Sequence, residues 1–285
     1  MAQAQPSTAP DPSLPPVRST PRMQSLVLVR GLAALFVAIH HAGRILAQPR
    51  FLGTEAFGGI YERFTGVNYF FVLSGFFIGW INWKLIGRKD AALEFGLTRM
   101  ARIYPGYWIV FVPLAILYLA FPSSGMEHQR DPANIALSFL LLPYVHPPVY
   151  GVAYTLIHEA LFAAVIAAVI RFGRRSLWLL PVWAVAIVVA HAMFDVLPYP
   201  VGFIFHSANL QFLLGLGTSR LVATRTVPAP ALFAVAGGGL YLGFMLFGAG
   251  LLAEPLADAT TYGVASCLLL AGLVGLERRR PIHVP

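Results

Sequence analysis

A cationic and a titratable side chain, Arg30 and His41, lie eleven residues apart within an apolar run long enough to span a bilayer. Ionisable groups at membrane depth are costly to bury, so they usually face a cavity or mark a functional site. Eleven residues make about three helical turns, which places both side chains near one face with roughly 16 Å between their Cα atoms. One helix would then present a cation near one membrane surface and an imidazole near mid-depth. The alternative is an arginine that snorkels to the headgroups and a histidine bonded to a neighbouring helix.

Three further charged residues have spacings or surroundings that suggest chemistry. Arg99 and Arg102, three residues apart, would share a helical face and could hold a phosphate bidentately. The alternative is ordinary positive charge that fixes the topology of a membrane protein. Glu159 follows His158 directly, and adjacent residues of a helix point about 100° apart, so the two are not expected to serve one site equally. Glu159 is the more costly to bury and the better functional candidate, whereas His158 is more typical of a hydrogen-bonded interior residue.

Small and polar residues mark the apolar run that follows Gly66. Asn68, Ser74 and Gly75 give this run a polar, close-packing face, which most often serves helix packing. A nucleophilic role of Ser74 is not expected, because its flanks do not form the strand, elbow and helix that such a serine needs. The sequence has no spacing of His, Cys, Asp or Glu that is typical of a structural zinc site, and no phosphate-binding glycine loop. We therefore expect no metal and no resident cofactor.

The composition indicates a membrane protein. Of the 285 residues, 58% are hydrophobic and only 11% are charged, where soluble domains carry about 25% charged residues. The formal charge of +8 raises the question of nucleic-acid binding. However, the cations cluster at the ends of apolar runs, as the positive-inside rule expects, and no nucleic-acid motif accompanies them. The single cysteine, Cys267, excludes an intramolecular disulfide.

The apolar runs predict an all-α fold, a polytopic bundle of about eight transmembrane helices. Each run is within or close to the roughly 17–25 residues that cross a hydrocarbon core of about 30 Å. The expected spans are Leu26–Leu46, Val67–Ile86, Ile103–Phe121, Val152–Ile170, Leu177–Phe194, Val201–Leu221, Ala229–Phe247 and Thr260–Leu276. A ninth run, Asn134–Tyr144, is too short to span comfortably and predicts a re-entrant or partial helix.

The N-terminal segment and the charged loops suggest how the domain is arranged. Residues 1–22, rich in Pro, Ala, Ser and Gln, predict a disordered tail before a membrane domain over residues 23–285. If the N-terminus is cytoplasmic and Asn134–Tyr144 does not cross, most Lys and Arg residues lie on the cytoplasmic side. A full crossing would move many of them outside, so the positive-inside rule favours the first arrangement.

Four motifs within residues 26–160, taken in order, resemble acyltransferase family 3, whose members O-acylate surface polysaccharides, lipid-linked sugars and related molecules. Each motif is weak alone, but together and in this order they are specific. The segment 209–217 is also similar to the family, less distinctively. The four motifs are Arg30 with His41 eleven residues on, the segment 66–76 ending Phe-Phe-Val-Leu-Ser-Gly-Phe, Arg99-x-x-Arg102 followed by Ile-Tyr-Pro-x-Tyr107, and Tyr154-Thr-Leu-x-x-Glu159.

The resemblance implies an integral membrane O-acyltransferase of the bacterial cytoplasmic (inner) membrane. Such an enzyme moves an acyl group, acetyl first of all, from acyl-CoA to a hydroxyl of a carbohydrate or lipid-linked acceptor. The resemblance implies His41 as the base for the hydroxyl proton and Glu159 as the carboxylate that orients it. His40 falls where the family has an apolar or aromatic residue. The remaining implied residues are the acyl-CoA phosphate ligands Arg30, Arg99 and Arg102 and the supporting residues Asn68, Ser74, Tyr107 and Tyr154.

The chain departs from the family pattern at three places. Asn68 stands where the family usually has aspartate and Tyr154 where it usually has tryptophan, and neither change removes the expected catalytic group. The chain stops at Pro285, where a member would normally continue into a further span, so we expect a domain that is incomplete at its C-terminus. Two other functions stay open. One is a transporter or flippase-like carrier, because intramembrane Arg, His and Glu also build substrate pathways. The other is an inactive truncated remnant.

Overall fold

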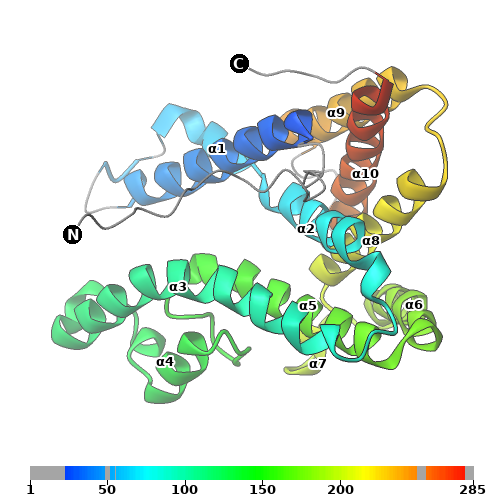
Figure 1. Ribbon diagram of the computed structural model, residues 1–285. Coiled ribbons are helices and arrows are strands. Elements are labelled where there is room, and N and C mark those ends of the chain that lie inside the picture. The colour runs from blue at the N-terminus through cyan, green and yellow to red at the C-terminus, as the bar shows by residue number, and fades with distance from the viewer. Residues whose placement is uncertain (1–22, 49–51, 55, 249–254, 280–285) are drawn as a thin grey trace, which may run out of the picture.

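The computed structural model describes residues 23–48, 52–54, 56–248 and 255–279, and this part of the chain contains helices and loops but no strand (Figure 1). The predicted tail, residues 1–22, lies outside the described residues. The long helices are α1 (Gln24–Leu46), α2 (Val67–Asn82), α3 (Ala91–Ala120), α5 (Tyr154–Phe172), α6 (Leu179–Met193), α8 (Ser207–Thr224), α9 (Pro230–Phe247) and α10 (Pro255–Arg279). The short ones are α4 (Pro132–Phe139) and α7 (Val201–Ile204), with 3-10 turns η1 (Ala56–Arg63), η2 (Trp83–Leu85), η3 (Pro122–Ser124), η4 (Glu127–Gln129), η5 (Gly151–Ala153) and η6 (Arg174–Trp178).

Seven helical segments are long and apolar enough to cross a membrane, so the chain is an integral membrane protein with an all-α fold. One of the eight predicted spans, Val201–Leu221, is not among the seven. It is divided into α7 and α8 at Phe205 and His206. The His206 Nδ1 accepts a hydrogen bond from the Ala208 N–H and caps the start of α8. Most of α8 is buried against α2, α6 and α10, so it can carry polar side chains that a lipid-facing helix could not.

Helix α3 is longer than the predicted span over Ile103–Phe121, because it begins at Ala91. Its 30 residues give a length of about 45 Å, against a hydrocarbon core of about 30 Å. Arg99 and Arg102 lie in the part of α3 that precedes the predicted span, one turn apart on the same helix.

The short run near Asn134 forms α4, which at eight residues is about 12 Å long and does not span a bilayer. Asp131 caps its start by accepting hydrogen bonds from the backbone N–H groups of Ala133 and Asn134, both at 3.2 Å. Its last carbonyls are bonded by three side chains of α3. These bonds run from Tyr107 to Ser138 (2.8 Å), from Trp108 to Phe139 (3.0 Å) and from Tyr104 to Leu140 (2.6 Å).

The centre of the molecule is the packing of α2 against α8, and α10 covers both and pairs with α9 (Figure 1). The two central helices approach backbone to backbone at Gly75 and Gly215. A Cβ atom at Gly75 would overlap the Phe212 carbonyl, and one at Gly215 would overlap the Val72 carbonyl. Helix α1 leans on α2 and α10, while α3 pairs with α5 on the other side of α2.

Two glycines on α8 allow a matched test of this close approach. Gly215→Ala should destabilise the protein by about 1–3 kcal/mol, because the added methyl group forces α2 and α8 apart. Gly217→Ala, two residues on, meets no heavy atom within 4 Å and should stabilise the helix by about 0.5–1 kcal/mol. Thermal unfolding of both variants in one detergent measures the difference. A midpoint for Gly215→Ala at or above the wild-type value would contradict the packing described.

Candidate functional site

Glu159 is the point at which three helices meet. Its Oε1 lies 3.7 Å from Nη1 of Arg99 on α3, and the same oxygen accepts a hydrogen bond of 3.1 Å from Ser74 on α2. The two charged side chains are 11% exposed for Arg99 and 24% for Glu159. The Arg99 guanidinium also lies 5.7 Å from the centre of the Phe95 ring. The predicted site residues Ser74, Arg99 and Glu159 therefore belong to one cluster, although no spacing in the sequence pairs them.

Asn68 lies two turns before Ser74 on α2 and faces α8. Its side-chain oxygen accepts a hydrogen bond of 3.0 Å from Gln211, whose amide nitrogen also lies 3.0 Å from the Ala259 carbonyl on α10. An asparagine here can accept from Gln211 without the cost of burying a charge. Gln211 links the three packed helices and was not singled out from the sequence. A lone glutamine within an otherwise apolar segment was the available signal.

Tyr154, at the first turn of α5, is hydrogen-bonded to His206, with 2.7 Å between the hydroxyl and Nε2. Because Nδ1 of His206 accepts from the Ala208 N–H, the proton of a neutral His206 lies on Nε2 and is donated to Tyr154. His158, one turn after Tyr154, is fully buried, and its Nδ1 lies 3.1 Å from the Asn209 side-chain oxygen. Its other nitrogen, Nε2, is buried and has no hydrogen-bond partner in the described part of the chain. His158 is thus a hydrogen-bonded interior residue, as expected, and His206 is a half-buried residue that is hydrogen-bonded through both ring nitrogens.

His41 lies on α1, whose end packs against η1. Its ring contacts the edge of His40, with 5.5 Å between the centroids. His40 is the more firmly held of the two, because its Nδ1 lies 3.1 Å from the Tyr61 carbonyl and 3.9 Å from a Glu62 carboxylate oxygen. Glu62 also lies 3.5 Å from Arg44. Sequence reasoning did not point to Glu62, which lies in a polar stretch with no recognisable pattern.

Among the described residues, no hydrogen bond, ion pair or ring contact joins His41 to Glu159. Figure 1 shows the reason: α1 lies on one side of α2, and α3 with α5 lies on the other. The structure therefore holds these two residues in separate places, and their joint action stays a prediction.

The remaining predicted residues differ in whether their side chains form hydrogen bonds or ion pairs. Arg30 and Arg102 are exposed, and within the ranges that the structure describes neither forms a hydrogen bond or an ion pair. Tyr107 is buried and serves α4, as described above. Arg30 and Arg102 are accordingly the predicted phosphate ligands whose guanidinium groups are available, whereas Arg99 already faces Glu159.

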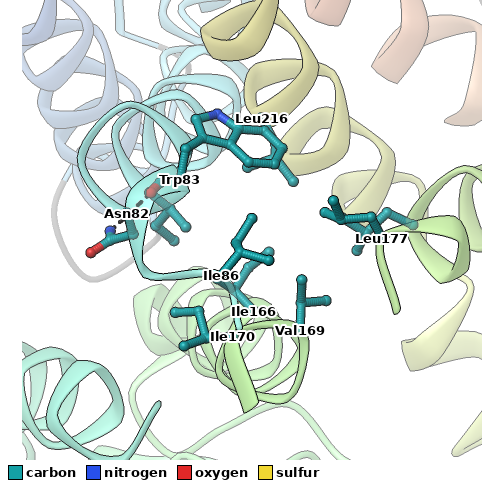
Figure 2. A pocket seen from close by; sticks show the side chains of 11 residues that line it. Asn82, Trp83, Ile86, Ile166, Val169, Ile170, Leu177 and Leu216 are labelled. Atoms are coloured by element: carbon teal, nitrogen blue, oxygen red, sulfur yellow. Dashed lines mark hydrogen bonds between the residues drawn. The ribbon is translucent and has the colours of Figure 1, made fainter. Parts of the chain in front are cut away.

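A small apolar hollow lies where the C-terminal ends of α2 and α5 meet η6 and the middle of α8 (Figure 2). Its volume is about 10 Å³, room for about one water molecule, and its walls include Ile86, Val169 and Leu177. The Asn82 amide at its rim donates to the Ile78 carbonyl at 2.8 Å. This hollow is too small for an acyl chain or a pantetheine arm.

The chain matches the model of an acyltransferase domain over residues 23–280, which includes every residue of the clusters described above. The chain belongs to acyltransferase family 3. No curated protein and no solved structure matches it. As a family member it is a membrane O-acyltransferase that transfers groups other than aminoacyl groups. This membership favours acyl transfer over the carrier function that the sequence left open.

The Arg99–Glu159 pair should be measurable as a coupling. Arg99→Gln and Glu159→Gln should each lower stability, and the double variant should lose less than their sum, with a coupling of about 0.5–3 kcal/mol. Arg102→Gln is the matched control on the same helix. Arg102 forms no hydrogen bond or ion pair with any described residue, so this variant should leave the midpoint of thermal unfolding unchanged. Additive losses in the double variant would mean that the pair contributes no interaction energy.

Proposed function

We propose that the protein transfers an acyl group, acetyl first of all, from acyl-CoA to a hydroxyl of a carbohydrate or lipid-linked acceptor. The observation that carries this proposal is the match to an acyltransferase domain along nearly the whole described chain, with Arg30 and His41 on one continuous helix, α1. The polysaccharide acceptor follows from the family resemblance. We also propose the bacterial cytoplasmic membrane as its location, with the N-terminus in the cytoplasm.

His41 is the proposed general base. The acceptor hydroxyl oxygen attacks the thioester carbonyl carbon while the imidazole takes the hydroxyl proton. The carbon–sulfur bond then breaks, and the imidazolium returns the proton to the leaving thiolate, giving the ester and free coenzyme A. An imidazole suits both steps because it gains and loses a proton near ambient pH. His41 is only partly buried, which leaves it open to a substrate.

Arg30 and Arg102 are the proposed ligands of the coenzyme A phosphates. Their guanidinium groups are exposed and unpaired among the described residues, and a planar guanidinium can hold two phosphate oxygens at once. Arg99 could also contact a coenzyme A phosphate, but its guanidinium would then interact with the phosphate and with Glu159 at the same time. The proposed role of Glu159 is therefore to hold Arg99, and with it α3 against α5, in addition to any effect on the base.

The distribution of charge supports the proposed orientation. Lys84, Arg88 and Lys89 lie between α2 and α3, and Arg174 and Arg175 begin η6. The Gly87 N–H donates to the Ile170 carbonyl at 3.0 Å, so these two basic loops lie side by side. Short basic loops remain on the cytoplasmic side of bacterial membranes, and the phosphates of acyl-CoA would be met there.

The two neighbouring histidines allow the base to be tested with identical substitutions. His41→Asn should lower kcat for coenzyme A release by about 10²–10⁴-fold, the usual contribution of a general base. His40→Asn should retain most of the activity, because an asparagine amide can still donate to the Tyr61 carbonyl. Release of coenzyme A by purified protein with acetyl-CoA and an acceptor is the measurement. Equal losses in the two variants would remove the assignment of His41.

The donor site predicts a selective effect on the Michaelis constants. Arg102→Ala should weaken donor binding by about 1.5–3 kcal/mol, seen as a raised donor KM, because a remote phosphate clamp binds ground state and transition state alike. Lysine at this position should rescue only part of the loss. Arg88→Ala, in the neighbouring basic loop, is the control and should leave both constants unchanged. A donor KM of Arg102→Ala equal to wild type would reduce Arg102 to a topology-setting charge.

A further inference from the structure

The connections between α3 and α5 form an open polar hollow of about 770 Å³. Its walls come from η4, from the start of α4 and from the loop that follows α4. The lining residues combine two carboxylates, one guanidinium and two imidazoles: Glu127, His128, Arg130, Asp131 and His146. The centroids of the His128 and His146 rings, which both line the hollow, lie 6.0 Å apart, and Tyr144 meets His146 edge-on with 5.6 Å between the centroids.

The walls of this hollow are tied together by amide side chains. Asn134 is fully buried, and its side-chain nitrogen donates to the carbonyls of His128 (2.8 Å) and Pro147 (3.0 Å), one on each side of the hollow. Gln129 adds a bond of 2.9 Å to the Val149 carbonyl. The hollow is therefore formed before any ligand arrives, as binding sites for small molecules usually are.

An apolar groove of about 500 Å³ adjoins the hollow along the surface between α3 and α4. Arg130 lines both the groove and the hollow. Of the next two residues, Asp131 lines the hollow and Pro132 lines the groove. Apart from Arg130, the groove is lined by apolar residues: Phe111, Leu119, Pro132, Ile135, Ala136, Phe139 and Leu140. Figure 1 shows α4 beneath the C-terminal half of α3, away from α1 and α10.

We propose that the hollow and the groove form one binding site for a glycolipid-like amphiphile, with its sugar in the hollow and its chain in the groove. An apolar chain can enter from the surrounding hydrocarbon, and the sugar would then lie at the membrane boundary. Carboxylates accept hydrogen bonds from hydroxyls, and ring faces stack on the apolar faces of sugars. With two carboxylates against one guanidinium, the hollow favours an uncharged headgroup over a phosphate.

This inference goes beyond the proposed function, because the groove lies along α3 and α4, whereas His41 lies on α1, across α2, so the amphiphile is held apart from the proposed base. The hollow and Arg102 lie toward opposite ends of α3, with about 26 Å of helix between Arg102 and Leu119. A donor held at Arg102 and an amphiphile held in the groove would thus occupy opposite ends of α3 and would not compete.

The test uses the full chain in lipid nanodiscs and a dodecyl maltoside that carries a photoreactive diazirine in its alkyl chain. Mass spectrometry locates the label, which we expect on α3 between Phe111 and Leu119 and on α4. Unlabelled dodecyl maltoside should compete, whereas dodecyl phosphocholine and free maltose should compete at least about tenfold more weakly, a difference of about 1.4 kcal/mol. Equal competition by dodecyl phosphocholine, or label spread over all lipid-facing helices, would overturn the proposal.

Two variants and two controls make the result specific. Ala136→Phe fills the groove and His146→Ala removes a ring from the hollow, and each should lower labelling about tenfold. Ala236→Phe is the matched control, because Ala236 is an exposed alanine on α9, outside the groove. His41→Asn should label like wild type, since binding needs no turnover. Labelling without coenzyme A release from any acceptor would defeat the proposed function alone, and release without site-specific labelling would defeat this inference alone.

Discussion

The contact of α2 with α8 at Gly75 and Gly215 fixes the geometry of the polar interior. Because the two backbones touch there, Ser74 next to Gly75 is directed toward α5, and Gln211, one turn before Gly215, reaches Asn68. A membrane interior offers no water to satisfy polar groups, so a small displacement of either helix would leave several of them unpaired. Two residues without side chains thus determine where the functional side chains lie.

The same lack of water explains the segment around Tyr107. A short helix at membrane depth ends with carbonyl groups that no later turn can satisfy. In α4 the side chains of Tyr104, Tyr107 and Trp108 donate to these carbonyls from the neighbouring helix. The Ile-Tyr-Pro-x-Tyr motif that follows Arg102 therefore has a structural role, because its two tyrosines join α4 to α3.

The sequence was sufficient for the class of the protein, the family and the helical location of most candidate residues, because apolar length and ordered motifs are local properties. It did not predict that Glu159 faces Arg99, since that pairing depends on how α3 packs against α5. It also did not predict that Val201–Leu221 is divided into α7 and α8, with most of α8 buried against other helices. Hydropathy cannot distinguish a helix surrounded by lipid from one surrounded by other helices, and only the polar residues Asn209 and Gln211 hinted at the latter.

Helix α3 has a mechanical consequence for the enzyme. It carries cations toward one end and borders the apolar groove at the other, and its length exceeds the usual hydrocarbon thickness by about 15 Å. A thicker bilayer would cover more of this excess length, and a thinner one would tilt the helix further from the membrane normal or expose more of it. The chain length of the host membrane's lipids therefore changes the distance from Arg102 to the nearest aqueous phase. That distance in turn affects how easily a charged donor reaches Arg102.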